Sequence, residues 1–336
     1  MINRSTFLKL AAGLAFSALA APALAQDKVT FGTNWVAQAE HGGYYQAVMD
    51  GTYKKFGLDV TIAPGGPQAN NRMLMTVGRI DFYMGGMLQA LVAIEQNIPT
   101  VTIAAIFQKD PQVLLAHPGQ GIEKFTDLKK LPSLYISKDG VASYYQWMKA
   151  ELGFTDEQVR PYTFNPQPFL ADKRSAMQGY LSSEPYLIER EAKFKPVVFL
   201  LADNGYDPYS TTIETTQAVL RDKPDVARRF VEATIIGWNN YLYGDNKAAN
   251  ELIKKDNPDM SDDKIAYAIA KMKELGIVDS GDAIKLGVGA MTEERVKGFY
   301  DKMVKAGVIK AGLDWKKAFD LRFVNKGVGI DLRPKN

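Results

Sequence analysis

An aromatic ring and a carboxylate are the side chains of this sequence best suited to hold a small polar ligand. Trp35 follows the strand-like run 29–34, and Glu184 is preceded by two serines and followed by Pro185. A ligand N–H bonded to a desolvated carboxylate contributes about 1.5 to 3 kcal/mol, whereas one aromatic contact adds about 0.5 to 1.5 kcal/mol. We therefore expect Glu184 to set the ligand class and Trp35 to add affinity. The alternatives are core packing for Trp35 and helix-start electrostatics for Glu184.

Six other side chains are candidates for the same site. They are Asn34, His41, Tyr44, Ser143, Tyr186 and Tyr206. An amide beside Trp35 is costly to bury without a partner, which favours a ligand-facing position. We expect Tyr186 to supply a second aromatic face. Tyr206 is a candidate ligand contact, with a solvent-facing loop position as the alternative.

His41 and Ser143 each precede or open a predicted helix. Gly42 and Gly43 follow His41, and glycine lets a backbone approach a ligand closely. Capping or structural duty is the alternative for this histidine. Tyr44 has a neighbouring tyrosine on the same helix, so one of the two rings belongs to the core. Free N–H groups near Ser143 could hold an anionic solute, with an ordinary helix entrance as the alternative.

Composition excludes several classes of protein. The 41 Lys and Arg residues nearly balance 38 Asp and Glu residues, so no positive excess exists to bind a nucleic acid. Cysteine is absent, which excludes disulfides, thiolate metal sites and cysteine nucleophiles. The two histidines, His41 and His117, are too few for a histidine-rich metal site. Phosphate-loop, dinucleotide and nucleophile-elbow patterns are missing as well. We expect no metal, no cofactor and no catalytic residues, and so a protein that is not an enzyme.

The first 25 residues have the pattern of a cleaved secretory signal peptide. Arg4 and Lys9 precede an apolar run over residues 10–19, and Ala23 and Ala25 supply the small residues of a cleavage site. The run is shorter than the roughly 20 residues that a membrane-spanning helix needs. The sequence therefore predicts an exported, periplasmic protein.

Strands and helices must alternate to position these side chains. Strand-like runs lie at 29–34, 58–63, 80–84 and 101–107, with helical spacing between them at 43–56, 68–77 and 87–96. A second series has strands at 134–137, 159–162 and 196–201 and helices at 141–152, 170–177 and 184–193. Helices alone follow, at 224–243, 247–255, 261–275 and 292–306. Alternation of this kind predicts α/β sheets with mostly parallel strands, and ligands bind beyond the carboxyl ends of such strands.

The late helices have no strands of their own, so we expect them to pack on the first sheet. This assigns residues 26–110 and 208–336 to lobe 1, with a helical C-terminal extension, and residues 111–207 to lobe 2. Two crossover segments, near 108–112 and 202–212, would join the lobes.

Several short motifs together resemble one family. They are Asn34-Trp35, His41-Gly42-Gly43-Tyr44-Tyr45, Phe56-Gly57-Leu58-Asp59-Val60, Gly78-Arg79-Ile80-Asp81-Phe82, Ser183-Glu184-Pro185-Tyr186 and Gly205-Tyr206-Asp207-Pro208-Tyr209. The set resembles type II periplasmic solute-binding proteins of ABC importers, in the branch that binds nitrate, sulfonates, taurine and thiamine-pyrimidine precursors. The resemblance implies the two-lobed type II periplasmic binding protein fold, with each lobe a mostly parallel sheet flanked by helices.

The same resemblance implies a function. Its pyrimidine-precursor branch suggests that the protein captures a small polar heterocycle between its lobes and delivers it to an ABC transporter permease as a monomer. An aliphatic sulfonate or an aromatic carboxylate is the alternative solute. A pyrimidine-synthesising enzyme is a more distant alternative, because such relatives carry a cysteine cluster that this chain lacks.

Overall fold

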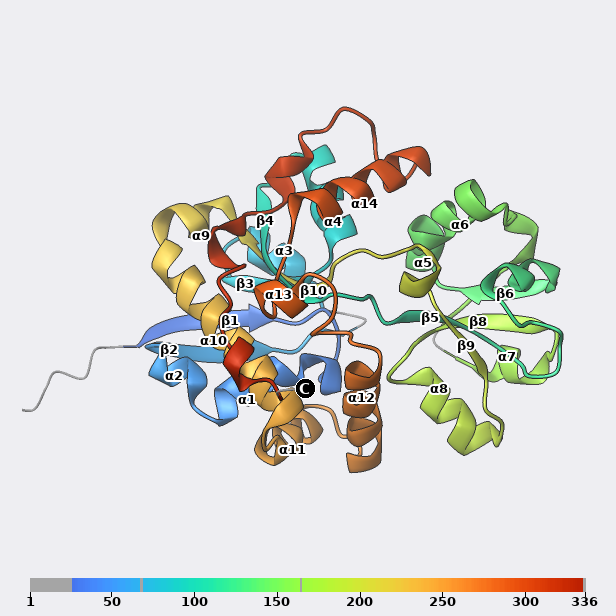
Figure 1. The fold of residues 1–336 in the computed structure, drawn as a ribbon, viewed down its shortest axis with the longest axis horizontal. Helices are drawn as coiled ribbons and strands as arrows, with labels where there is room; N and C mark the ends of the chain where they lie inside the picture. The colour runs from blue at the N-terminus through green and yellow to red at the C-terminus, as the bar shows by residue number, and fades with distance from the viewer. Residues whose placement is uncertain (1–25, 67–68, 164, 335–336) are drawn as a thin grey trace, which may run out of the picture.

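Two lobes make up the computed structural model, which describes residues 26–66, 69–163 and 165–334 (Figure 1). The predicted signal peptide lies outside these residues. The first sheet has the order β2-β1-β3-β10-β4, and the second has the order β7-β6-β8-β5-β9. The first comprises β1 (Asp27–Gly32), β2 (Leu58–Ala63), β3 (Phe82–Gly85), β4 (Thr100–Phe107) and β10 (Ser210–Thr216). The second comprises β5 (Gln112–Ala116), β6 (Ser133–Ile136), β7 (Val159–Pro161), β8 (Ser175–Tyr180) and β9 (Val197–Leu200).

Each sheet has one strand that runs against the other four. In the first sheet, β10 is antiparallel to both β3 and β4, whereas β1 is parallel to β2 and β3. In the second sheet, β5 has the same position and is antiparallel to β8 and β9. The reversed strands are the ones that the chain enters after passing from one lobe to the other. The predicted fold class, with mostly parallel sheets in two lobes, is confirmed.

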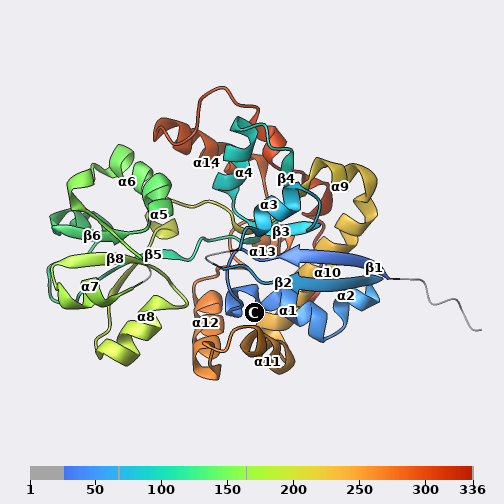
Figure 2. The ribbon, with the colours of Figure 1, turned by 180° about the vertical axis from the view of Figure 1, so that it is seen from behind.

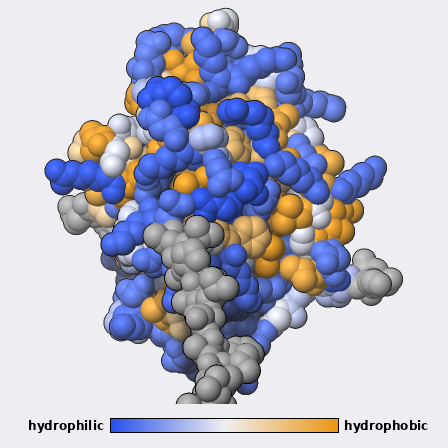
Figure 3. All heavy atoms as spheres, turned by 90° about the vertical axis from the view of Figure 1, so that its left-hand side faces the viewer, coloured by the Kyte–Doolittle hydropathy of each residue, from blue (hydrophilic) through white to orange (hydrophobic). Residues whose placement is uncertain are grey.

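Helices cover both sheets, as Figures 1 and 2 show from opposite sides. Those of the first lobe are α1 (Gly42–Met49), α2 (Thr52–Lys55), α3 (Asn71–Thr76), α4 (Met87–Glu95), α9 (Gln217–Asp222), α10 (Pro224–Tyr243), α11 (Lys247–Asp256), α12 (Asp262–Glu274), α13 (Ala283–Leu286) and α14 (Glu293–Lys305). Those of the second lobe are α5 (Lys138–Ala142), α6 (Tyr144–Leu152), α7 (Gln167–Ala171) and α8 (Glu184–Leu187). Seen end on, the first lobe has a mainly hydrophilic surface with scattered apolar side chains (Figure 3). No helix of the described residues combines the length and apolar character needed to cross a membrane.

The C-terminal helices belong to the first lobe. Phe230 of α10 stacks on Phe82 of β3, with ring centroids 4.4 Å apart. Bridges join β4 to later segments, at Ala105 with Gly289 and at Thr102 with Phe319. The late helices therefore extend the core of the first sheet.

Helix α14 holds both crossover segments to the first lobe. The Arg295 guanidinium donates hydrogen bonds to the backbone carbonyls of Gln108 and Asp207, one on each crossover. Lys302 adds an ion pair to the Asp207 carboxylate, with a nitrogen–oxygen distance of 2.6 Å. The crossovers are thus fixed at the lobe 1 side of the cleft.

Three predicted helices differ in the structure. The predicted helix 170–177 is wrong, because α7 ends at Ala171 and the last three predicted residues belong to β8, a strand with five of six residues buried. Helix 43–56 is broken at Gly51, whose φ of +74° is a left-handed conformation that glycine adopts without strain. Helix 141–152 is interrupted at Ser143, between α5 and α6.

Candidate ligand-binding cleft

A continuous cleft lies between the lobes. It comprises a first cavity of about 240 Å³ and a second cavity of about 280 Å³, and Asn34, Gln112 and Tyr180 line both of them. Asn34 follows β1 in the first lobe, whereas Gln112 and Tyr180 are paired across β5 and β8 in the second. The carboxyl ends of β1 and β3 border this cleft, as expected for a sheet with mostly parallel strands.

The first cavity brings Trp35 and Glu184 together from opposite lobes. The Glu184 carboxylate accepts a hydrogen bond from the backbone N–H of Tyr180 at 2.6 Å. Burial raises the pKa of Glu184, and the N–H groups of Tyr180 and of Glu184 itself oppose the shift. Gly179 permits this arrangement, because a Cβ there would lie 2.9 Å from the Cβ of Glu184. The carboxylate is therefore held at the cavity wall.

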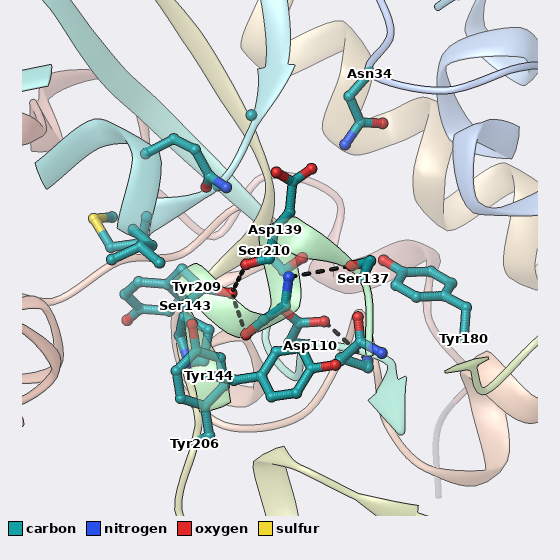
Figure 4. Close-up of a pocket in the computed structure, with 18 of the residues that line it drawn as sticks. Asn34, Asp110, Ser137, Asp139, Ser143, Tyr144, Tyr180, Tyr206, Tyr209 and Ser210 are labelled. Carbon is teal, nitrogen blue, oxygen red and sulfur yellow. Dashed lines mark hydrogen bonds between the residues drawn. The ribbon is translucent and has the colours of Figure 1, made fainter. Parts of the chain in front are cut away.

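The second cavity is built around Asp110, which sequence reasoning missed. The Asp110 carboxylate accepts a hydrogen bond from the N–H of Gln112 at 2.9 Å (Figure 4). Burial raises the pKa of Asp110 to about 6, against the effect of that bond. Tyr144, Tyr180 and Tyr206 line the same cavity. Burial is the main cause that raises the pKa of each of these three phenols, and the charge of Asp110 contributes to all three. Asp110 lies in the first crossover segment. This position between the lobes is the signal that could have identified it as a cleft residue.

Two N–H groups near the helix entrance that contains Ser143 are occupied. The backbone N–H of Ser137 donates to Gln178 Oε1 at 2.6 Å, and that of Gly140 donates to Ser137 Oγ at 3.1 Å. The Ser143 hydroxyl donates to the carbonyl of Asp139 at 2.6 Å, so it lines the cavity as an acceptor. An anion that used either of these two N–H groups would have to displace a bond that the protein already makes.

Among the described residues, Arg72 supplies the guanidinium that lines the cleft, and its charge is already balanced. Arg72 Nε lies 3.1 Å from an oxygen of Glu214, and Arg72 Nη2 donates to the carbonyl of Gln89 at 3.0 Å. Glu214 is fully buried; burial raises its pKa, and the Arg72 charge opposes this. The pair offers little net positive charge to a ligand.

His41 and Tyr44 lie away from both cavities, in the core of the first lobe. Tyr44 is fully buried and stacks on Phe31, with ring centroids 4.1 Å apart. A Cβ on Gly43 would lie 2.2 Å from the indole of Trp238, so this glycine allows α1 to approach α10 and not a ligand. His41 is fully buried with both ring nitrogens unpartnered, and burial lowers its pKa to about 3. The expectation that these two residues face the cleft is therefore wrong.

Tyr186 also lies outside the two cavities. Its hydroxyl accepts a hydrogen bond from Arg190 at 2.5 Å, and its ring lies 5.1 Å from that of Tyr267 on α12. Arg190 also forms an ion pair with Asp263 of the first lobe, at 2.8 Å. Tyr186 thus belongs to a contact between the outer parts of the lobes, and its predicted place opposite Trp35 is wrong.

Asn34, Trp35, Ser143, Glu184 and Tyr206 all line the cleft, and their contacts with a ligand stay predictions. Tyr206 is 4% exposed, because its ring packs against Tyr144, Trp147 and Phe299. This burial excludes the alternative of a solvent-facing loop residue.

Curated proteins of two kinds are similar to this chain. A 4-amino-5-hydroxymethyl-2-methylpyrimidine phosphate synthase from Schizosaccharomyces pombe is 26% identical over 117 residues, which are 35% of this chain and 34% of the synthase. The alignment thus spans about a third of that relative. The riboflavin-binding protein RibY from Chloroflexus aurantiacus is 21% identical over 320 residues, which cover 90% of this chain and 87% of RibY.

Solved structures share the fold. A ligand-binding component of an ABC-type import system from Staphylococcus aureus has a TM-score of 0.63 at 11% identity, over 89% of this chain and 98% of that chain. The periplasmic aliphatic sulphonate-binding protein SsuA from Escherichia coli has a TM-score of 0.59 at 12% identity, over 87% of this chain and 91% of SsuA.

The prediction that the protein is not an enzyme is contradicted by these comparisons. The synthases are named as enzymes, and the desulfurization enzyme DSZB has the same fold, with a TM-score of 0.58 at 11% identity. The family model for NMT1/THI5-like proteins matches residues 38–248, more than half of the chain. The predicted resemblance is confirmed: this protein shares the fold of the periplasmic binding proteins among its structural neighbours, and it belongs to the NMT1/THI5-like family.

Proposed function

We propose that this protein is the exported solute-binding component of an ABC importer, and that it captures a small planar nitrogen heterocycle of the aminopyrimidine class in the cleft between its lobes. The single observation that carries the proposal is that Trp35 and Glu184 line one cavity from opposite lobes. A ring stacked on the indole would be contacted by the first lobe, and its N–H groups by the second. Such a ligand favours the closed arrangement, because only there do both lobes reach it.

The chemistry of Glu184 supports a ligand that donates hydrogen bonds. Its carboxylate accepts a hydrogen bond from the N–H of Tyr180, and its own backbone N–H also favours the charged form. Burial raises its pKa, which reflects the cost of holding a charge away from water. An amino or ring N–H of the ligand would offset this cost. Names among the relatives agree with a planar nitrogen heterocycle, since one binds riboflavin and others form an aminopyrimidine phosphate.

An aliphatic sulfonate or an aromatic carboxylate is the alternative solute, favoured by the sulfonate-binding structural neighbours. The charges of the cleft oppose it. Asp110, Asp139 and Glu184 line the two cavities, and Arg72 is neutralised by Glu214. An anion would therefore meet uncompensated carboxylates.

Export and delivery are part of the proposal. Residues 1–25 have the pattern of a cleaved signal peptide, and the structural neighbours include periplasmic binding proteins and components of ABC importers. We expect a periplasmic monomer that docks on a membrane permease.

Thermal-shift screening followed by calorimetric titration tests the ligand class. The panel is 4-amino-5-hydroxymethyl-2-methylpyrimidine, riboflavin, an alkanesulfonate and phthalate. We expect the aminopyrimidine to raise the melting temperature, because binding to the native state stabilises it by mass action. If only the alkanesulfonate or phthalate bound, the proposal would be overturned. Mass spectrometry of the ligand recovered after binding shows whether the protein has converted it chemically.

Glu184→Gln tests the site. Glutamine keeps an oxygen for the N–H of Tyr180, so the wall of the cavity should persist, while the charge is lost. Removing the charge-assisted bond should weaken binding of the aminopyrimidine by about 10- to 150-fold, the equivalent of roughly 1.5 to 3 kcal/mol. Glu189→Gln, an exposed carboxylate in the turn that follows α8, is the matched control and should bind like the wild type. Unchanged affinity in Glu184→Gln would refute the assignment of Glu184.

A further inference from the structure

We infer that the cavity around Asp110 is a second subsite, which binds a protonated amine of the same ligand. The ligand is then elongated, with a planar heterocycle between Trp35 and Glu184 and an ammonium group beside Asp110. This inference rests on the proposed function, because it takes the interlobe cleft as the ligand site. It adds the chemical class of the second half of the ligand.

Asp110 is a half-buried carboxylate without a cation. One of its oxygens accepts the N–H of Gln112 at 2.9 Å. Among the described residues, no lysine or arginine forms an ion pair with it, and neighbouring Lys109 pairs instead with Asp203 at 3.0 Å. Glu214, the other carboxylate buried beside this cavity, has the Arg72 guanidinium as its partner. A desolvated charge is stable only with a partner, and Asp110 has room for one on its cavity side.

Aromatic rings surround this carboxylate. Tyr144 and Tyr206 are each 4% exposed, and their ring centroids lie 6.1 Å apart at an interplanar angle of 69°. Tyr180 lines the same cavity from β8, and Figure 4 shows these rings around Asp110. The Tyr144 hydroxyl already donates to Gln178 Oε1 at 3.1 Å, so this phenol is fixed within the protein. Ring faces attract cations, and a carboxylate with several tyrosines is suited to an ammonium group.

The size and charge of the cleft fit a ligand that spans both cavities. Asn34, Gln112 and Tyr180 line both, so no wall separates the 280 Å³ and 240 Å³ spaces into unrelated sites. Tyr180 connects them directly, because its backbone N–H holds Glu184 while its ring lines the Asp110 cavity. One ammonium group would reduce the excess of negative charge along the cleft.

The test compares ligands that differ in one group. The probes are 2-methyl-4-aminopyrimidines that carry hydroxymethyl, aminomethyl or 3-aminopropyl at one ring carbon, and 1,4-diaminobutane without a ring. Calorimetry at pH 7.5 should give an affinity for the better aminoalkyl probe about tenfold or more above that for the hydroxymethyl probe, as expected for a charge-assisted hydrogen bond. Equal affinities in the wild type would overturn the inference without any variant.

Asp110→Asn should abolish this preference and leave the hydroxymethyl affinity within about threefold of the wild type. Asparagine keeps an oxygen for the N–H of Gln112, and a thermal melt without ligand checks the fold. Asp59→Asn is the matched control, because Asp59 is an exposed carboxylate of β2 that lines neither cavity, and it should keep the preference. A preference that persists in Asp110→Asn, or that disappears equally in Asp59→Asn, would overturn the inference.

Failure of the proposed function gives a different pattern. If no pyrimidine binds, the proposed function is wrong, and 1,4-diaminobutane then decides on the subsite. Binding of this diamine to the wild type but not to Asp110→Asn supports an ammonium subsite. Absence of diamine binding in that case overturns both.

Discussion

Glu40 and His41 are adjacent buried residues whose ionisation should affect stability in opposite directions. Both lie in the short 3₁₀ turn Ala39–His41, and they are 2% and 0% exposed. Burial raises the pKa of Glu40 from 4.5 to about 6, while the hydroxyl of Ser182 in the other lobe donates a bond that opposes the shift. Burial lowers the pKa of His41 from 6.5 to about 3. Below the pKa of Glu40 and above that of His41, both groups are therefore mainly neutral in the native state.

The sign of each contribution follows from which state binds more protons. For Glu40, the native state holds a proton that the unfolded state releases, so its contribution is full below pH 4.5 and is lost as the pH rises to 6. The shift of about 1.5 pH units corresponds to about 2 kcal/mol. For His41, the unfolded state holds the extra proton, so its contribution is full above pH 6.5 and falls by about 1.4 kcal/mol for each pH unit below it, down to about pH 3.

Between pH 4.5 and 6 the two contributions have opposite slopes, and single substitutions should reveal them. Relative to the wild type, the free energy of unfolding of Glu40→Gln should gain about 1.3 kcal/mol as the pH rises from 4.5 to 6, because the two pKa values lie at the ends of this range and the full change of about 2 kcal/mol needs a wider one. That of His41→Leu should lose about 2 kcal/mol over the same range. Urea denaturation at closely spaced pH values measures both, and Glu189→Gln is the control for an exposed carboxylate.

The comparison uses the difference between the curves of unfolding free energy against pH for a variant and for the wild type, because all other titrating groups contribute equally to both. Parallel curves for Glu40→Gln and the wild type would show that Glu40 ionises normally in the folded protein. A His41→Leu curve parallel to that of the wild type would refute the burial argument for His41 in the same way.

Three other expectations follow from the structure. Trp35→Ala should weaken binding of the aminopyrimidine about 2- to 10-fold in calorimetry, the equivalent of roughly 0.5 to 1.5 kcal/mol of stacking, and Trp35→Phe should restore part of it. In urea denaturation, Gly43→Ala should lower the free energy of unfolding by about 1 to 3 kcal/mol, because its Cβ would overlap Trp238. Gly298→Ala, on an open face of α14, should instead raise the free energy of unfolding by about 0.5 to 1 kcal/mol. Binding of an aminoalkyl ligand at pH 6 should release a fraction of a proton, because the ammonium group lowers the pKa of Asp110 from about 6. Calorimetric titrations in buffers of different ionisation enthalpy measure this proton release, which should disappear at pH 8.

Local sequence patterns were sufficient to predict the helices that are defined by capping residues and amphipathic spacing. Helix α10 has the predicted bounds, 224–243, with a proline in its first turn, and Ser261 caps α12 through a bond to the N–H of Lys264. Strand β8 was missed because Ser175–Tyr180 contains no β-branched residue. Its central place in the second sheet, which depends on partners distant in sequence, decides its conformation.

The same distinction applies to the site. Position after a strand was enough to place Trp35 in the cleft, since the carboxyl end of a strand borders it by topology. His41 and Tyr44 were misplaced because the decisive contact, α1 against Trp238 of α10, joins segments about 200 residues apart. Asp110 carries no local motif, and only the path of the crossover puts it into the cavity.

The buried carboxylates near the cleft differ in their hydrogen-bond and ion-pair partners, as Glu184, Asp110 and Glu214 illustrate. Glu214 is fully buried and has a guanidinium partner, so its charge is satisfied without a ligand. Glu184 and Asp110 each accept a hydrogen bond from a backbone N–H, that of Tyr180 and that of Gln112, and burial raises the pKa of both. In the proposed site, a ligand that donates to both carboxylates recovers the desolvation cost that folding leaves at these two positions, while its ring contacts Trp35 of the first lobe. Under this proposal, contacts with both lobes select the ligand and favour the closed cleft, and a solute that cannot stack on Trp35 should close the lobes less completely.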